Sequence, residues 1–421
     1  MKLINWIVVV VLVMMADFAQ AQLSSSAYTA MGIGEIHDRT TVNQAAMGDV
    51  GIGLPRVNSI NTLNPAFLYL NHFTTIDVAF QSEKRSVKAE NAKGSLGASG
   101  YKYLTFSFPI IPYRWTSSLS LNPYSSINYN LNAVRQVEGD EQNDYQIQTI
   151  GSGGLTEFRL SHGVKIHDQL AVGLRTSILF GFSEQKNIYS LTGQGFTGIA
   201  NQVLIKEDYR GYDFGLGVAY NKRFGEEKIL FAGLTYDLAN DLNGTRHADA
   251  SALNLLNELS ELEDEQVKGQ TSLPAKLGVG LGWVKQNEWN IGLDITYSAW
   301  KASPEFVAGE RKYSDTFTAG LGMEYIPEFD DVDNYLARVR YRLGVKYEQL
   351  PAGIGTYSKN VNDFGINFGW SLPVRGLSTL NMAFKYGQRG TIEDNQVKES
   401  YFRFMLGATF NDRWFVRRKY N

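Results

Sequence analysis

A hairpin of strictly alternating side chains, from Lys276 to Ser298, constrains this fold more than any other stretch. In each half, a large apolar residue alternates with a small or polar one, and a short polar turn joins the halves at 285–288. A period of two places the two classes on opposite faces of a strand. The apolar set is Leu277, Val279, Leu281, Trp283, Ile291, Leu293, Ile295 and Tyr297. A soluble sandwich can alternate in the same way, so one hairpin does not decide the class of protein.

The same alternation recurs to the end of the chain. It returns with the same polarity in residues 230–236, 317–324, 364–370 and 402–410. An apolar face toward lipid and a polar face toward a lumen are typical of membrane-spanning barrels. The sequence therefore predicts an all-β fold, a transmembrane antiparallel β-barrel of about 14 strands, with twelve or sixteen as the alternatives.

The lengths of the predicted connections support a barrel in the outer membrane of a Gram-negative bacterium. Short turns, such as 167–168 and 285–288, alternate with long loops, such as 185–202 and 241–274. Outer-membrane barrels have short periplasmic turns and longer external loops. We therefore expect both termini on the periplasmic side.

Composition excludes several other classes of function. The net charge is −3 and no large block of like charge occurs, so we expect no nucleic-acid partner. The chain has no Cys, which excludes disulfides and cysteine-ligated metals. It has 41 Gly, 23 Tyr and 23 Phe, which suits aromatic girdles and a thin inward face.

The N-terminal 72 residues lack the barrel pattern. Lys2, an apolar run over 6–16 and a small-x-small site at 19–21 predict a signal peptide over 1–21, with a single-helix anchor as the alternative. Residues 22–72 are rich in Gly and turn residues, with a short helix expected near 41–47. We expect this segment to be a hatch that plugs the barrel formed by residues 73–421.

One long loop has leucines that can serve either a structural or a functional role. Residues 252–262 place Leu at helical spacing, which predicts an amphipathic helix in the fourth external loop. Its Leu255, Leu256 and Leu259 form one wall of a ligand groove, or they simply cap the rim. The other wall is Ile188, Tyr189, Leu191, Phe196 and Ile199 of the loop at 185–202.

A row of cations is predicted to face the lumen from one strand. Arg338, Arg340 and Arg342, with Lys346, either pair with inward acids such as Glu324 and Asp294 or attract an anionic head group. We favour the pairing. The five His are scattered, so we expect no enzyme activity, no metal site and no cofactor. Gly151 to Gly154 indicates a bulge or kink.

Together, the signal peptide, a Gly-rich segment ending in Asn64-Pro65-Ala66 and the fourteen-strand pattern make the chain similar to the long-chain fatty acid transporter (FadL-type) family. The resemblance implies that the tripeptide belongs to the hatch and that the third and fourth external loops form an entry groove. It also implies an inward kink of the third strand that opens a lateral gap. Proline has no amide hydrogen and sits at edges or bulges of sheets. We place the kink at Pro123, with Asn64, Pro65 and Ala66 packed opposite, and a harmless bulge is the alternative.

These features predict a monomeric outer-membrane diffusion channel. Its partners would be a hydrophobic small molecule, such as a long-chain fatty acid, and outer-membrane lipid. The rival hypothesis is a barrel component of a protein secretion or assembly complex. The basic tail at 412–421 has no assigned role.

Overall fold

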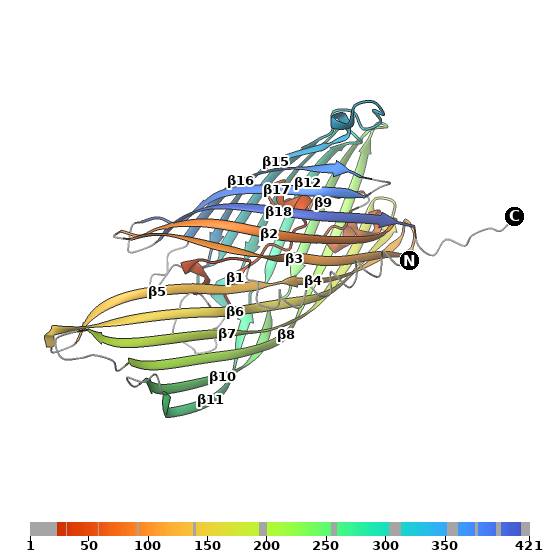
Figure 1. Ribbon diagram of the computed structural model, residues 1–421. Helices are drawn as coiled ribbons and strands as arrows, with labels where there is room; N and C mark the ends of the chain where they lie inside the picture. Colours follow the sequence, from red (N-terminus) through yellow and green to blue (C-terminus); the bar gives the residue numbers. More distant parts are fainter. Residues whose placement is uncertain are drawn as a thin grey trace, which may run out of the picture.

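Fourteen antiparallel strands form a closed barrel, because the last strand pairs with the first (Figure 1). The computed structural model describes residues 23–413, apart from Met31, Asn58, Asn91, 138–139, 193–199, 254–258, 303–312, 352–360, 375–377 and 393–396. The predicted signal peptide and most of the basic tail therefore lie outside the described residues. Three of the fourteen strands are interrupted and carry two labels each.

In chain order, the barrel strands are β2 (Thr74–Lys88), β3 (Lys93–Ile111), β4 with β5 (Trp115–Pro123 and Ser125–Val137), β6 (Asp140–His167), β7 (Leu170–Thr192), β8 (Ala200–Phe224), β9 with β10 (Lys228–Asp237 and Asn240–Leu253), β11 with β12 (Leu259–Leu273 and Lys276–Lys285), β13 (Trp289–Ser298), β14 (Thr316–Tyr325), β15 (Arg340–Leu350), β16 (Val361–Pro373), β17 (Thr379–Arg389) and β18 (Lys398–Asp412). Short 3-10 helices η4 (Trp300–Ala302) and η5 (Tyr335–Arg338) lie in the connections.

The outward faces of the strands form an apolar belt. On β8, the outward side chains from Tyr212 to Tyr220 are all apolar and exposed, with Phe214, Leu216 and Val218 between the two tyrosines. Aromatic residues at both edges of an apolar band are typical of barrels in a lipid bilayer. The chain is thus an outer-membrane β-barrel, as its alternation predicts. Among the described residues, no helix is long and apolar enough to cross a membrane.

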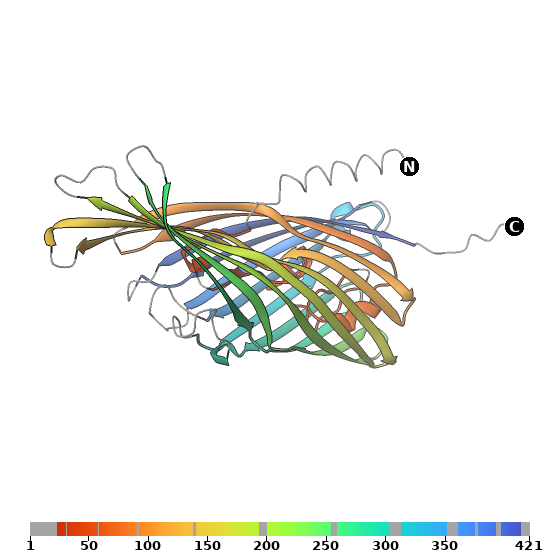
Figure 2. The ribbon, with the colours of Figure 1, turned by 90° about the horizontal axis from the view of Figure 1, so that it is seen from below.

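Six neighbouring strand segments continue past the belt as a sheet outside the membrane (Figure 2). They are β5, the outer parts of β6, β7 and β8, and then β10 and β11. On β8 the outward side chains change at this point to Lys206, Asp208 and Arg210. The sheet bends where β6 and β7 have glycines at positive φ, including Gly153 at 120° and Gly154 at 140°. The kink predicted over 151–154 is therefore confirmed.

The helix predicted over 252–262 is wrong. Residues up to Leu253 belong to β10 and residues from Leu259 belong to β11, and the two strands pair from Asn240↔Leu273 to Leu253↔Leu259 with one register shift between Ala250 and Ser251. The edge of β8 also pairs with β10, so extended backbone here gains hydrogen bonds on both sides. This pairing overrides the helical spacing of the leucines.

Residues 23–72, called the hatch below, lie inside the barrel (Figure 1). They form η2 (Ala27–Ala30), β1 (Glu35–Ile36), α2 (Val42–Ala45) and η3 (Pro65–Leu70). Thr41 caps α2, and Gln44 completes a capping box, so the short helix predicted at 41–47 is present. The hatch backbone runs directly against glycines of the wall. An added Cβ on Gly322 would stand 2.1 Å from the Met47 carbonyl oxygen, and one on Gly344 would stand 2.2 Å from the Gly48 nitrogen.

Candidate functional site

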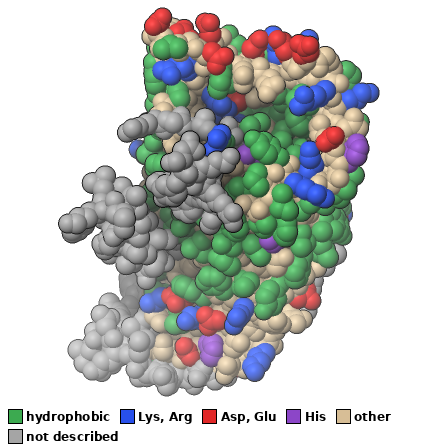
Figure 3. All heavy atoms as spheres, turned by 90° about the vertical axis from the view of Figure 1, so that its right-hand side faces the viewer, with side chains coloured by type: hydrophobic (Ala, Val, Ile, Leu, Met, Phe, Trp, Pro, Cys, Tyr) green, Lys and Arg blue, Asp and Glu red, His purple; other side chains and the backbone are tan. Residues whose placement is uncertain are grey.

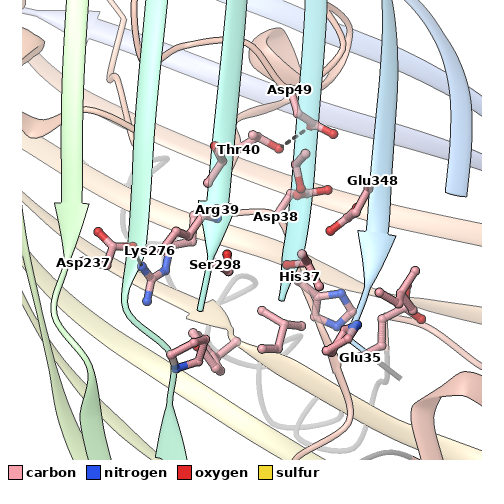
Figure 4. Close-up of a pocket in the computed structure, with 18 of the residues that line it drawn as sticks. Glu35, His37, Asp38, Arg39, Thr40, Asp49, Asp237, Lys276, Ser298 and Glu348 are labelled. Atoms are coloured by element: carbon pink, nitrogen blue, oxygen red, sulfur yellow. Dashed lines mark hydrogen bonds and ion pairs between the residues drawn. The ribbon is translucent and has the colours of Figure 1, made fainter. Parts of the chain in front are cut away.

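A cavity of about 230 Å³ lies between the hatch and the outer rim of the barrel. One part of its lining is apolar and comes from Ile33, Tyr124, Leu273, Pro274, Trp300, Tyr313, Leu350 and Pro351. The other part is charged, with Glu35, Asp38, Arg39 and Asp49 of the hatch facing Asp237, Lys276 and Glu348 of the wall (Figure 4). An amphipathic molecule matches such a lining better than a purely apolar one.

Arg39 of the hatch holds the carboxylates on one side of the cavity together. Its guanidinium lies 2.6 Å from Asp213, 3.1 Å from Glu157 and 3.3 Å from Asp237. Arg175 of β7 also contacts Asp237, at 2.7 Å. Each carboxylate in this group therefore has a cation, which is what a buried charge needs.

Lys276 differs from the other cations of the cavity. It is the first residue of β12 and lines the cavity, and its side chain is exposed there. Within the part of the chain that the structure describes, its ammonium group has no hydrogen-bond or ion-pair partner within 4.0 Å. Asp237, opposite Lys276 on β9, acts on this charge at longer range. An ammonium without a direct partner beside an apolar wall can bind a carboxylate whose hydrocarbon chain lies on that wall.

The predicted ladder of cations is partly realised. Arg342 lies 2.6 Å from Glu324, and Arg340 lies 3.9 Å from the same carboxylate. Hatch residue Arg56 completes the group at 3.2 Å from Glu324. Arg338 does not belong to the ladder, because it is in η5 before β15 begins.

Lys346 and Asp294 both bind the hatch directly. The ammonium of Lys346 lies 2.6 Å from Asp38 and 3.3 Å from Asp49, both hatch residues. The carboxylate of Asp294 accepts three hatch amide hydrogens, from Gly51, Ile52 and Gly53, at 2.6, 2.6 and 3.1 Å. Asp294 therefore does not pair with the ladder.

The structure places the strand break at Pro123. β4 ends at this residue, and its last partner on β3 is Leu104, paired with Leu121. Beyond that point, residues 93–103 of β3 pair with β2 but with no other described strand. The free side of β5 is met instead by hatch strand β1, through Glu35↔Ser126 and Ile36↔Ser125.

Two details of the predicted kink are different in the structure. Pro123 pairs with Thr156, two pairs beyond the last lipid-facing aromatic of β6, Phe158, so the break is at the outer margin of the belt. The hatch tripeptide is not opposite Pro123. The Asn64 amide donates to the Val218 carbonyl at 3.1 Å, and Pro65 and Ala66 pack on Gly173 of β7. The inward-facing glycines of β6, β7 and β8 leave room for the tripeptide against the wall.

The predicted groove residues fall mostly outside the described part of the chain. Leu255, Leu256, Phe196 and Ile199 are among the undescribed residues, and Leu259 is placed only as the start of β11. Ile188 and Tyr189 are on β7, which extends to Thr192. The loop expected at 185–202 is thus mainly paired strand. In the described ranges, no group of three or more His, Asp or Glu residues could hold a metal ion.

A family model described as BamG matches residues 1–421. The chain belongs to the BamG family. No curated protein sequence matches this BamG-family chain. Its fold is similar to the crystal structure of the Pseudomonas putida toluene transporter TodX, with a TM-score of 0.57, 15% identity, and coverage of 90% of this chain and 100% of TodX.

Two further structures show the same fold. The Ralstonia pickettii toluene transporter TbuX has a TM-score of 0.54, 14% identity, and coverage of 89% of this chain and 98% of that one. A Pseudomonas aeruginosa FadL homologue has a TM-score of 0.55, 14% identity, and coverage of 90% and 99%. The resemblance of this BamG-family chain to FadL-type barrels is therefore confirmed at the level of the fold.

Sequence reasoning missed the two residues that define the cavity chemistry. Lys276 could have been found, because it is the first inward position of the hairpin whose alternation is the clearest in the chain. Arg39 had no such signal, since the hatch has no periodic pattern and its partner Asp213 is 174 residues away.

Proposed function

We propose that this barrel lets hydrophobic small molecules cross the outer membrane by diffusion, and that long-chain fatty acids are among them. The observation that carries the proposal is the cavity, where an apolar wall stands beside the unpaired ammonium of Lys276. The similar folds of hydrocarbon and toluene channels support the same reading. Each methylene of an acyl chain that leaves water contributes about 0.8 kcal/mol.

A lateral exit at Pro123 fits this proposal better than passage along the barrel axis. The hatch closes the barrel on the periplasmic side, and its residues Asp38, Asp49 and Arg56 pair with charges of the wall. Displacing the hatch would strip partners from these buried charges, at about 3–5 kcal/mol for each. A molecule leaving beside β3 at the outer margin of the belt would break none of these pairs.

Uptake into proteoliposomes tests the proposal with two variants. Pro123→Val should restore strand pairing and slow hexadecanoate uptake, whereas Leu121→Val on the same strand should leave it unchanged. Lys276→Gln should reduce the preference for hexadecanoate over hexadecanol, and Lys268→Gln on the outer sheet serves as its control. Uptake by the parent protein no faster than in empty vesicles would overturn the proposal.

The second candidate is a barrel component of a protein secretion or assembly complex. The sheet formed by β5 to β8, β10 and β11 favours it, because a polar sheet outside the membrane offers area to a protein that a small-molecule pore does not require. Removal of the outer hairpin β10–β11 would then abolish complex formation while uptake, if any, stays unchanged.

A further inference from the structure

The connection between β14 and β15, residues 326–339, is the longest turn that the structure describes at the periplasmic end. The other turns at this end that the structure describes in full span only residues 112–114, 168–169, 225–227 and 286–288. The length has no counterpart in the barrel pattern, which needs only a short turn here.

This turn is well ordered by its own contacts. The Asp331 carboxylate accepts the amide hydrogens of Asp333 and Asn334, both at 2.8 Å. The Tyr335 hydroxyl donates to the carbonyl of Pro373, the last residue of β16, at 2.8 Å, and Ile326 is buried. The surface that the turn presents is therefore formed before any partner arrives.

Apolar side chains are exposed on this ordered turn, outside the lipid belt. Val332 is 85% exposed and Leu336 is 63% exposed, and Val374 of the adjoining turn is 60% exposed. Phe329 and Tyr335 are also exposed. Single exposed apolar residues are ordinary, but several on one formed surface with a polar rim mark an interaction site.

The rim of this surface is acidic. Glu328, Asp330, Asp331 and Asp333 have no cation within 4.0 Å among the residues described, and Arg338 is the basic residue beside them. Figure 3 views the periplasmic end and shows Asp and Glu side chains gathered along its upper edge, where Figure 1 places the connection before β15. Such a rim is repelled by an anionic lipid surface, which argues against an anchor in the bilayer.

We propose that this periplasmic loop surface, Phe329, Val332, Tyr335, Leu336 and Val374 with the four carboxylates, docks a periplasmic protein that presents apolar side chains within a basic rim. Desolvated apolar contacts at the centre would supply the affinity, and the charged rim would select the partner and its orientation. The proposal rests on the turn alone and holds whether or not the barrel carries small molecules.

Carbodiimide cross-linking in intact outer membranes tests the charge complementarity, because it joins carboxylates only to amines in direct contact. The full-length chain should give linked peptides between residues 328–333 and lysines of one periplasmic protein, identified by mass spectrometry. Asp330→Lys with Asp333→Lys should lower the yield about tenfold, the equivalent of 1.4 kcal/mol. Glu226→Lys, on another periplasmic turn, should leave the yield unchanged. Asp331 is kept, since it orders the turn.

A photo-reactive side chain at position 332 separates a protein partner from lipid. Adducts with the protein found by carbodiimide, lost in the charge-reversed variant, would support the docking surface. Adducts with phospholipid alone, or an unchanged yield after charge reversal, would overturn it. Heat-modifiable migration of every variant checks that the barrel is folded.

Discussion

The carbonyl oxygen of Ile52 in the hatch lies 1.7 Å from the point where a Cβ on Gly233 would stand. Gly233→Val should therefore prevent this part of the hatch from seating, and overpacking of this kind costs about 1–3 kcal/mol or more. We expect faster cleavage of the hatch by added protease and a lower Tm. Ala232→Val, on the opposite face of β9, is the matched control and should behave like the parent.

The two β15 arginines beside Glu324 should differ sharply in their effect on stability when each is changed to Gln. Arg342 is 1% exposed and contacts Glu324 at 2.6 Å, so Arg342→Gln leaves a buried carboxylate short of a partner and should cost about 3–5 kcal/mol. Arg340 is 34% exposed and 3.9 Å away, so Arg340→Gln should cost under about 1 kcal/mol. Denaturant unfolding in detergent measures both. Equal losses of unfolding free energy in the two variants would contradict the difference in role inferred from these distances.

Asp294 should be needed for the seating of the hatch. Asp294→Ala would leave the buried amide hydrogens of Gly51, Ile52 and Gly53 without their acceptor, at about 1–3 kcal/mol for each. Asp294→Asn keeps one acceptor oxygen and should retain part of the stabilisation of the hatch. Hydrogen exchange of residues 51–53 is the measurement, and unchanged protection in the Ala variant would refute the role.

The contact of the hatch with β5 should weaken in acid. Burial in the lumen lowers the pKa of His37 from 6.5 to about 4, and its Nε2 lies 2.7 Å from the Ser126 hydroxyl. Glu35 and Glu83 favour the protonated ring, whereas Arg403 and Lys102 oppose it. Because the unfolded hatch binds the proton more readily, the contribution of His37 is complete above pH 6.5 and is lost as the pH falls toward 4.

His37→Gln should remove this dependence, since Gln does not titrate in that range. Protease accessibility of the hatch at pH 7 and pH 5 gives the comparison. The parent should open more at pH 5, and the variant should show the same accessibility at both values. A variant that keeps the parent's pH dependence would assign the effect to another group.

The barrel could be predicted from the sequence because the membrane requires apolar outward side chains on every spanning strand. Leu277 and Ile295 are exposed to lipid as their alternation requires. That constraint ends at the margin of the belt, where β10 and the outer part of β8 have polar residues on the outward face. Without a lipid-facing pattern, residues 241–253 look like a loop, and the leucines of 252–262 then suggest a helix.

The candidate site was less readable for a different reason. Its chemistry depends on pairs that no local pattern connects, such as Arg39 with Asp213. The glycines that admit the hatch were visible as small inward residues, but the backbone that fills the space was not. The break at Pro123 could be predicted from the missing amide hydrogen, whereas its position at the outer margin depended on where the belt ends.

The pairing of the hatch with the final strands dictates an order of events during biogenesis. Ser26 donates to Glu399, 373 residues later, and Glu35 receives Arg389, 354 residues later. The hatch thus finds these partners only after the last strands have been made and inserted. Seating of the hatch and closure of the barrel by pairing of β18 with β2 must therefore occur together in one late step. A chain truncated near its C-terminus would be left with an unseated hatch that proteases can cleave.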